Sequence, residues 1–433
     1  MDTKHLFSAA LGLQAPWQIT SIDFDEETPD GRGRLEIRID FERGGRFPCP
    51  ECEELCTAHD TREQSWRHLD FFQHTSYLIA RTPRVDCKTH GVLKAEVPWA
   101  RPGSGFTLMF EALIMALASQ MPVAALGRIV REYDKRLWRI IEWHVADARS
   151  RVDMSDVDTL VVDETSQAKR KRYVSIFLEP KARDEAGRVT RPARVLFVAN
   201  TKSKMVFHEF AYDLVKHGGH PAWIRELCMD MCTPFLHGAS ETMPLAQITF
   251  DRFHVMKMVN AAVDEARKRE SRSRPELKKT RMDWLMAPER LSAKRKARMA
   301  SLSGRNLLTA KAYQMRLTLA ELWDAPTLAK AKRHLRSWCA WVKRATRPPK
   351  DQQAPWVLQR MRKVGESVRR NEDGIMRYVV SRLTSGVIEG INSLAQAARA
   401  RARGYSNPET FKTMIYLIAG RLSFDLPLAT HSK

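Results

Sequence analysis

The run Leu160-Val161-Val162-Asp163 decides how the middle of this chain folds. Three consecutive apolar residues indicate a short strand that is buried in a sheet. A strand of this kind that ends in an aspartate delivers the carboxylate at the edge of the sheet. We therefore predict a buried strand whose carboxyl end carries an acidic side chain.

The segments that follow this run alternate between strand-like and helical patterns. Asp230 follows the apolar stretch Leu227-Cys228-Met229 and so repeats the pattern of a strand that ends in an acid. Strands and helices that alternate along the chain indicate an α/β layer. The predicted strands comprise residues 173–178, 195–199, 224–230 and 247–251, and a helix is predicted over residues 207–216.

A third acidic residue, Glu389, lies on a predicted helix, because Ile388, Ile391 and Ala395 have helical spacing. Two strand-end aspartates and a helix-borne glutamate can hold two Mg²⁺ ions. Such a metal pair activates an attacking hydroxyl and stabilises the leaving oxygen of a phosphodiester. A solvated turn is the commoner explanation for any one of these acids, but the three together favour a metal site.

Two short motifs in the first hundred residues predict a structural zinc site. Two residues separate Cys49 from Cys52, and two separate Cys87 from His90. This spacing allows each pair to bind one tetrahedral zinc ion, and four protein ligands leave no open position for catalysis. Cys56 is a spare thiol that could replace one ligand. The chain has seven cysteines and no secretory signal, so a disulfide framework is not expected.

The cysteine motifs lie within a β-rich segment, and a helical segment follows it. Residues 34–96 have the pattern of short strands and turns, too small for a large apolar core, so the zinc site would act as a staple. Residues 106–145 have helical spacing in three short blocks, the second of which begins at Pro122. Three such helices are typical of a helix-turn-helix DNA-binding unit, and an ordinary three-helix bundle fits the same pattern.

The composition indicates a polyanionic partner. The 433 residues include 72 Lys and Arg against 51 Asp and Glu, which gives a formal net charge of +21. Nucleic acid is the commonest partner for such a charge, because each neutralised phosphate releases counterions. An anionic membrane surface is the alternative, but no apolar run has the length that spans a bilayer. Basic residues are dense between residues 256 and 385, where a solvated helix face and a DNA-facing surface are both good explanations.

Four sequence blocks resemble the ISL3 family of insertion-sequence transposases. They are residues 161–165 (VVDET), 228–231 (CMDM), 249–255 (TFDRFHV) and 386–392 (GVIEGIN). They stand in the family's order, and the zinc motifs and the helix-turn-helix segment also match the family's N-terminal half. The resemblance covers nearly the whole chain. It implies an RNase-H-like catalytic domain of the DDE class, interrupted by a helical insertion between Asp251 and the helix that bears Glu389.

The resemblance also implies residue roles. The fourth strand of an RNase-H-like sheet supplies the second acid, which points to Asp230, and Asp251 at the end of the fifth strand is the alternative. We favour Asp163, Asp230 and Glu389 as the ligands of two Mg²⁺ or Mn²⁺ ions. Asp251 and His254 resemble an Asp-x-x-His element beside the active site of related transposases. There His254 would contact the scissile phosphate or support the metal ligands.

Three arginines, Arg399, Arg401 and Arg403, follow Glu389 closely in the sequence. Phosphate contacts from these residues would position the DNA strand that is cut. A cationic helix end that complements the helix dipole explains the same residues equally well.

We expect an α+β multidomain protein that acts as a DNA transposase. It would bind the terminal inverted repeats of an insertion sequence, cleave DNA and transfer the cut strand to target DNA, as a homodimer in the bacterial cytoplasm at the nucleoid. The alternatives are a non-catalytic zinc and helix-turn-helix DNA-binding regulator and a nuclease that never joins strands. The predicted parts are a zinc-binding β-module (1–100), a helix-turn-helix (101–155), the first part of an RNase-H-like α/β catalytic domain (156–255), an all-helical insertion (256–383) and the last part of the catalytic domain (384–433).

Overall fold

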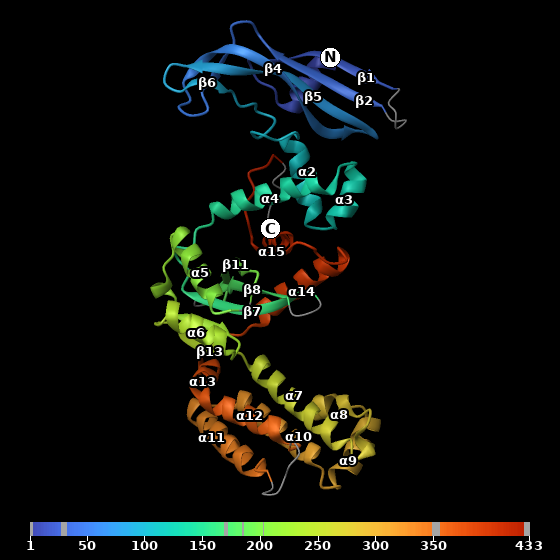
Figure 1. Cartoon of the computed structure of the whole chain (residues 1–433), viewed down its shortest axis with the longest axis vertical. Coiled ribbons are helices and arrows are strands. Elements are labelled where there is room, and N and C mark those ends of the chain that lie inside the picture. Colours follow the sequence, from blue (N-terminus) through green and yellow to red (C-terminus); the bar gives the residue numbers. More distant parts are fainter. Residues whose placement is uncertain are drawn as a thin grey trace. The chain divides into compact units, whose positions relative to one another are not determined.

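The computed structural model describes residues 3–26, 33–168, 172–183, 186–201, 203–348 and 356–427. The chain folds into two compact units. The first comprises residues 1–150, 400–403 and 422–433, and the second comprises residues 151–399 and 404–421. Both contain helices and strands, in agreement with the predicted mixed α and β composition (Figure 1).

A six-stranded sheet forms most of the first unit. The elements are α1 (Thr3–Leu11), β1 (Trp17–Asp25), β2 (Arg34–Phe41), β3 (Arg46–Pro48), β4 (Leu55–Phe71), β5 (His74–Cys87) and β6 (Gly91–Lys94). The strand order is β1-β2-β5-β4-β3, and β6 pairs with β5. Only β2 and β5 run parallel among these pairs.

This sheet is larger than the sequence predicted. The strand β1 precedes the predicted region, and β4 and β5 contain 17 and 14 residues where short strands were expected. Most of β4 is polar and exposed, so it lacks the alternation by which a half-buried strand is recognised. The core is also larger than expected, because Trp17 and Trp66 each contact Trp99 edge-on, with ring centroids 4.9 and 5.6 Å apart.

Three helices follow the sheet in the first unit, as predicted. They are α2 (Leu108–Ala118), α3 (Val123–Val130) and α4 (Asp134–Ser150). The hydroxyl of Thr107 accepts a hydrogen bond from the backbone N–H of Phe110 and so caps α2. Pro122 precedes α3, where its missing N–H costs no helical hydrogen bond.

A buried charge cluster joins α2 to α4. The carboxylate of Glu111, which is fully buried, accepts hydrogen bonds from Arg101 Nε at 2.9 Å, His144 Nε2 at 2.7 Å and Ser104 Oγ at 2.6 Å. Burial opposes ionisation of this group, but the hydrogen bonds from His144 and Ser104 and the charge of Arg101 lower its pKa. The cluster therefore fixes the helices to each other through an ionised carboxylate.

The second unit contains a five-stranded mixed sheet. Its strands are β7 (Thr159–Ala168), β8 (Arg172–Glu179), β11 (Arg194–Ala199), β12 (Glu226–Met229) and β13 (Gln247–Phe250), and a small hairpin pairs β9 (Ala182–Arg183) with β10 (Val189–Arg191). The order is β11-β8-β7-β12-β13. The first three of these strands are antiparallel neighbours, whereas β7, β12 and β13 run parallel. These strands confirm the predicted α/β layer.

Helices cover both faces of this sheet (Figure 1). On one face, Leu160 and Val162 of β7 belong to a core with α5 (Met205–Lys216) and α6 (Thr233–Thr242). Because side chains alternate along a strand, Val161 and Asp163 point to the other face. That face is covered by α14 (Gly386–Arg401) and α15 (Pro408–Ala419). The helices α14 and α15 thus lie on the side to which the first predicted catalytic acid points.

Seven helices in the described ranges separate β13 from α14 along the chain. They are α7 (Arg252–Glu270), α8 (Arg281–Leu285), α9 (Ala293–Ser303), α10 (Leu308–Ala320), α11 (Leu328–Ala345), α12 (Gln359–Arg370) and α13 (Glu372–Ser381). The 3-10 turns η2 (Pro275–Leu277), η3 (Pro288–Arg290) and η4 (Glu321–Asp324) lie among them, and η1 (Pro221–Trp223) precedes β12. Their apolar residues share one continuous core with the sheet, from Leu160 to Trp338. None of the helices in the described ranges is long and apolar enough to cross a membrane.

Candidate active site and metal centres

The parallel strands of the second unit bring three aspartates to one level at the edge of the sheet. In the register of β7 and β12, Cys228 lies beside Val161, so the next residues of the same orientation are Asp230 and Asp163. In the register of β12 and β13, Met229 lies beside Phe250, which places Asp251 at the same level. Neighbouring strands are about 4.8 Å apart. Asp230 is therefore one strand from Asp163, whereas Asp251 is two strands away.

The imidazole of His254 lies between the first two of these aspartates. Its Nε2 is 3.6 Å from Asp163 Oδ1, and its Nδ1 is 3.4 Å from Asp230 Oδ1. Both distances are longer than a hydrogen bond. Among the described residues, Asp163, Asp230 and His254 form a group whose ligand atoms lie close enough to hold one metal ion. The helix α7 begins at Arg252, directly after β13, and this is why its first turn reaches the sheet edge.

Asp163 has the most enclosed carboxylate of this group. Burial raises its pKa, and the nearby charge of Asp230 acts in the same direction. Hydrogen bonding and the charges of His254 and Lys257 act in the opposite direction. The side-chain amide of Asn392 donates a hydrogen bond of 2.8 Å to Asp163 Oδ2, which fixes the orientation of the carboxylate. A cation at this site would favour the ionised form of the carboxylate.

Asp251 lies outside this group and has a different environment. Its side chain is fully buried, and its carboxylate accepts hydrogen bonds from the hydroxyls of Ser385 and, at 3.5 Å, Thr384. These two residues immediately precede α14. Although Asp251 is the residue before α7, its carboxylate makes no capping hydrogen bond to that helix. It connects the sheet edge to the start of the helix that carries Glu389.

Glu389 lies in the first turn of α14, and its side chain is exposed. It lines a cavity of about 720 Å³ together with Phe253, Lys257 and Asn260 of α7. The residues that line this cavity do not include Asp163, Asp230 or His254, and Glu389 is not one of the residues whose ligand atoms gather there. Asn392 is on the same helix, three residues later, and so lies on nearly the same helical face.

A row of polar side chains joins α14 to β7. Asn392 contacts Asp163, and Gln396 Nε2 donates hydrogen bonds of 2.7 Å to Thr165 Oγ1 and to the carbonyl of Ser166. The next residue of this row, Arg399, donates to the same carbonyl at 2.8 Å. Residues 392, 396 and 399 are one and two helical turns apart, so α14 runs along the strand.

The other two arginines of the predicted DNA-contacting set lie at the end of α14, within the first unit. Arg401 donates a hydrogen bond of 2.5 Å to the carbonyl of Gln120. Arg403 follows the helix and has a positive φ of 57°. Contacts of these residues with DNA stay a prediction, and Arg399 also has a role within the protein.

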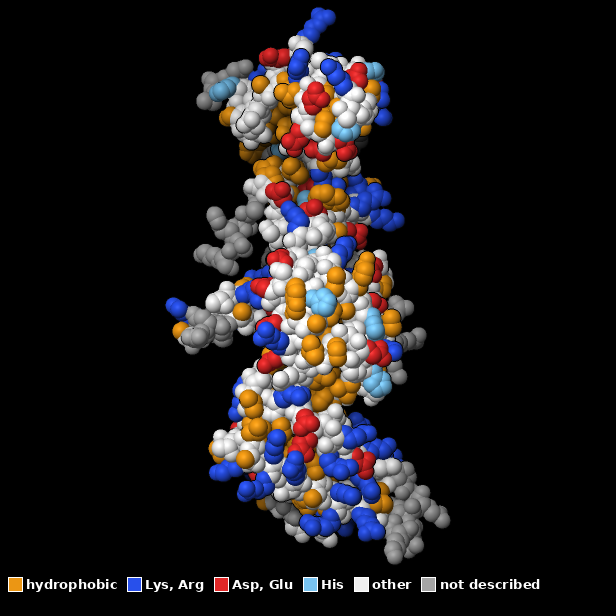
Figure 2. Space-filling model, turned by 90° about the vertical axis from the view of Figure 1, so that its left-hand side faces the viewer, with side chains coloured by type: hydrophobic (Ala, Val, Ile, Leu, Met, Phe, Trp, Pro, Cys, Tyr) orange, Lys and Arg blue, Asp and Glu red, His pale blue; other side chains and the backbone are white. Residues whose placement is uncertain are grey.

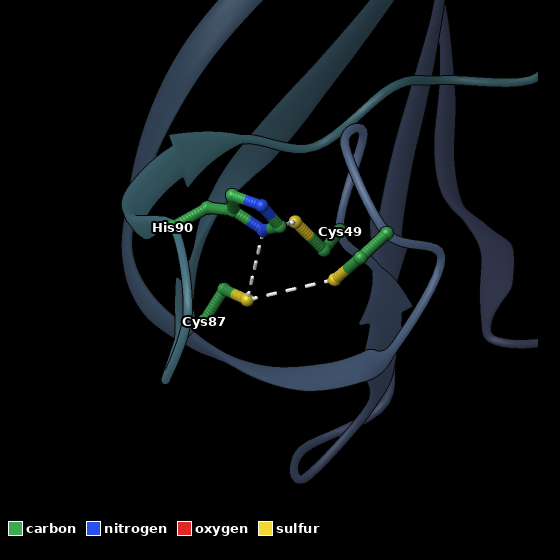
Figure 3. Close-up of side chains that lie close together, drawn as sticks. Cys49, Cys87 and His90 are labelled. Atoms are coloured by element: carbon green, nitrogen blue, oxygen red, sulfur yellow. Dashed lines mark hydrogen bonds between the residues drawn. The ribbon is translucent and has the colours of Figure 1, made fainter.

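The predicted zinc ligands come together in the first unit (Figure 3). His90 Nδ1 is 3.7 Å from Cys49 Sγ and 3.6 Å from Cys87 Sγ, and Cys52 Sγ is 3.8 Å from Cys87 Sγ. Zinc–sulfur bonds of about 2.3 Å in a tetrahedron imply sulfur–sulfur distances of roughly 3.8 Å. The four donors therefore already have the spacing of a tetrahedral zinc site.

The surroundings of one of these residues, Cys87, also favour a metal. Backbone N–H groups of His90 and Thr89 donate to the Cys87 sulfur and lower its pKa to about 6, so it is a thiolate near neutral pH. The alternative ligand, Cys56, is not part of the group, and its thiol points to the carbonyl of Glu54 at 3.3 Å. The four residues that the spacing predicted are therefore the four that meet.

Two residues of the candidate active site were missed from the sequence. Asn392 stands in the last family block, where its spacing of three from Glu389 was the available signal. Lys257 follows His254 by three residues on the same helix, and its charge acts on Asp163. Neither residue type is diagnostic alone, since an amide or a lysine on a helix is usually a solvated side chain.

Comparison with known proteins agrees with this arrangement. Residues 160–415 match the family described as "Transposase" of the ISL3 type with a DDE domain. Residues 95–145 match the helix-turn-helix domain of transposase family ISL3, and residues 45–90 match the zinc-finger of the transposases of IS204, IS1001, IS1096 and IS1165. The last match contains all four residues of the cysteine and histidine cluster, which supports a structural zinc.

Two curated relatives match most of the chain. The transposase for insertion sequence element IS1557 of Mycobacterium tuberculosis is 22% identical, over 96% of this chain and 96% of its own length. The transposase for IS1001 of Bordetella parapertussis is also 22% identical, over 84% of this chain and 86% of its own. Because the DDE family match alone spans more than half of the residues, this chain belongs to the ISL3 family of transposases.

Proposed function

We propose that this protein is an active DDE transposase, which cuts DNA at the ends of an insertion sequence and joins the cut strand to a target. The observation that supports this most directly is the pairing of Asp163 with Asp230 at the ends of adjacent parallel strands, beside the helix of Glu389. The strand order, with three antiparallel and three parallel strands that share β7, is the order expected of an RNase-H-like sheet. The helices α7–α13 would then be the insertion of that fold.

Asp163, Asp230 and Glu389 would hold two Mg²⁺ or Mn²⁺ ions. Carboxylate oxygens are the ligands that these hard cations prefer, and Asp163 and Asp230 converge at the sheet edge as such a site requires. Bound ions would supply charge stabilisation for the attacking and leaving oxygens of a phosphodiester. Asn392 would hold the Asp163 carboxylate in one orientation, and His254 would keep the two aspartates apart and in place.

Two reactions would follow at the same residues. In the first, water attacks the phosphorus at the element's end, and the bond to the 3′ oxygen breaks to release a 3′-hydroxyl. In the second, this hydroxyl attacks a target phosphodiester, and the target's own 3′ oxygen leaves. Each step exchanges one phosphorus–oxygen bond for another, so neither requires an outside energy source.

Asp251 is better explained as a residue that positions the catalytic helix. It is two strands from Asp163 and is already bonded to the hydroxyls of Ser385 and Thr384. Its carboxylate would hold the first turn of α14, and therefore Glu389, against the sheet edge. The distance of two strands between Asp251 and Asp163 supports the proposal that Asp230 is the second ligand.

The N-terminal parts would recognise the DNA. The helix-turn-helix and transposase family matches imply DNA binding, and the terminal inverted repeats are the proposed target of the zinc module (1–100) and the helices of residues 101–155. The catalytic parts would be residues 156–255 and 384–433, with the insertion at 256–383. Synapsis of two element ends would require a homodimer.

The test is cleavage and strand transfer of a labelled transposon-end duplex with Mg²⁺, comparing wild type with Asp230→Asn and Asp251→Asn. We expect cleavage by wild type, no detectable cleavage by Asp230→Asn, and a slower reaction with Asp251→Asn. Wild-type protein that binds the ends and never cuts them would support the regulator alternative. Cleavage without any joining to a second DNA would indicate a nuclease.

A further inference from the structure

The helices α11 and α12 carry charge of almost one sign. The helix α11 contains six basic residues and no acidic one, and α12 contains five basic residues and one glutamate. Like charges three or four residues apart on a helix are mutually destabilising. Figure 2 shows Lys and Arg side chains gathered over the helical part of the second unit. A polyanion bound to these helices would offset this repulsion.

Most of these cations have no acidic partner. The ion pairs involve Arg336 with Glu372 at 2.7 Å, Arg362 with Glu366 at 3.3 Å and Arg360 with Glu265 at 3.0 Å. The remaining basic residues of the two helices have no ion pair with any described residue; they are Lys330, Lys332, Arg333, Lys343, Arg344, Lys363, Arg369 and Arg370.

A groove lies between the two helices. They approach closely at Gly365, where an added Cβ would be only 2.7 Å from Val342 Cγ1, and the thiol of Cys339 points to the Gly365 carbonyl. The groove has a volume of about 500 Å³, and Arg336 and Lys343 are among the residues of α11 that line it. Cys339, Ala340 and Gly365 also line the groove, as do Glu366 and Glu372, the glutamates that pair with Arg362 and Arg336.

The two rims have the same spacing of cations. Arg336 and Lys343 are seven residues apart on α11, and Arg362 and Arg369 are seven residues apart on α12. Seven residues correspond to about 10.5 Å along a helix. This is close to the axial length of three nucleotides of duplex DNA, at about 3.4 Å per phosphate on each strand. Arg336 and Arg362 are held by glutamates, so each rim also offers one unpaired cation, Lys343 or Arg369.

We propose that the groove between α11 and α12 binds the phosphodiester backbone of duplex DNA, independently of base sequence. The proposal rests on the proposed function for the identity of the polyanion as DNA. It adds a contact surface that is separate from the helix-turn-helix and from the catalytic residues. Phosphate contacts of this kind position a duplex and carry no sequence information. The groove would therefore hold DNA that the N-terminal parts do not read.

The test uses the full-length double variant Lys343→Glu/Arg369→Glu and a matched control, Lys294→Glu/Lys296→Glu, on the exposed surface of α9. Both change the net charge equally. Affinity for a duplex of arbitrary sequence is measured without divalent metal at salt concentrations from about 50 to 200 mM. We expect the groove variant to bind at least about tenfold more weakly than the control. Its plot of log affinity against log salt should be shallower by about 1.8, since each lost phosphate contact removes about 0.9.

A second measurement identifies the occupant directly. A photo-crosslinking amino acid at Ala340, on the α11 side of the groove, should form an adduct with the DNA. Equal affinities and salt slopes of the groove variant and the control would overturn the proposal. So would the absence of any DNA adduct from Ala340. Neither measurement requires cleavage, so the groove proposal and the proposed transposase activity can fail independently. A protein that never cleaves DNA could still bind it in the groove, and an active transposase could lack this contact.

Discussion

The zinc cluster of the first unit and the aspartate group of the second are both sets of candidate metal ligands. They differ in how completely protein groups surround the position of the metal. The four donors of the zinc cluster already surround one point, with donor separations of 3.6 to 3.8 Å. Asp163, Asp230 and His254 offer three such groups, and the fourth predicted residue, Glu389, lines a cavity that none of the three lines. A metal with four protein ligands stabilises a fold, whereas catalysis requires open positions. This difference is what the proposed roles require, a structural one for the zinc cluster and a catalytic one for the aspartate group.

The largest effect on activity should come from a change in the aspartate group of Asp163, Asp230 and His254. We expect Asp163→Asn to reduce strand cleavage by at least about a thousandfold, since it removes the central carboxylate around which the other groups are arranged. Binding of the element's ends, measured by gel shift, should stay within a few-fold of wild type. Loss of end binding together with cleavage would contradict the assignment, because it would mean that the variant has lost its fold.

Changes at the zinc cluster should affect folding and DNA binding, whereas Asp163→Asn should affect cleavage alone. We expect Cys87→Ser to lose stoichiometric zinc and to lower the thermal stability of the first unit, since structural zinc sites contribute directly to folding. Removal of zinc by a chelator should have the same effect and should weaken DNA binding. Acid should also release the metal, because its cysteine ligands must be thiolates. Purified wild-type protein without zinc would disprove the assignment. Cys56→Ser is the matched control and should keep the metal.

A change at Asp251 would show whether cleavage depends on the contacts that hold the start of α14 against the sheet edge. We expect Asp251→Asn to slow cleavage by about ten- to a hundredfold, as is typical when a residue that orients a metal ligand is changed. The amide keeps the size of the carboxylate but can accept only at one oxygen, so one of the two hydroxyls of Ser385 and Thr384 loses its acceptor. Ser385→Ala should have a similar, milder effect. Complete loss of activity in Asp251→Asn alone, with Asp230→Asn active, would make Asp251 the ligand.

The zinc cluster was easier to predict from the sequence than the aspartate group, for physical reasons. Zinc ligands come from tight turns with fixed spacing, so Cys49, Cys52, Cys87 and His90 could be found without knowledge of the fold. The proximity of Asp163 to Asp230 depends on the register of two strands that are far apart in the chain, and only the family resemblance favoured Asp230 over Asp251. The Asn392 contact also depends on how α14 lies on β7, which no local pattern encodes. The long polar strand β4 was missed because it buries few apolar side chains.

A smaller effect is expected from the buried cluster at Glu111. Glu111→Gln should destabilise the first unit by about 3 kcal/mol, because Arg101 and His144 lose a buried charged partner. The pKa of Glu111 is lowered in the folded protein, so its stabilisation is present above the unfolded pKa and is lost as pH falls through the folded value. Thermal unfolding between pH 7 and pH 3 should show this acid loss in wild type and less of it in the variant. Identical pH profiles would contradict the proposed role.

The smallest effect should come from the row of contacts that holds α14 along β7. Gln396 donates to both Thr165 and Ser166, and it lies two turns from Glu389. We expect Gln396→Leu to slow cleavage only a few-fold, because Asn392 and Arg399 still hold the helix on either side. Gln396→Glu should be worse than leucine, since a carboxylate cannot donate and would face the Ser166 carbonyl. Equal rates for the two variants would mean that this contact only packs the helix and does not set the position of Glu389.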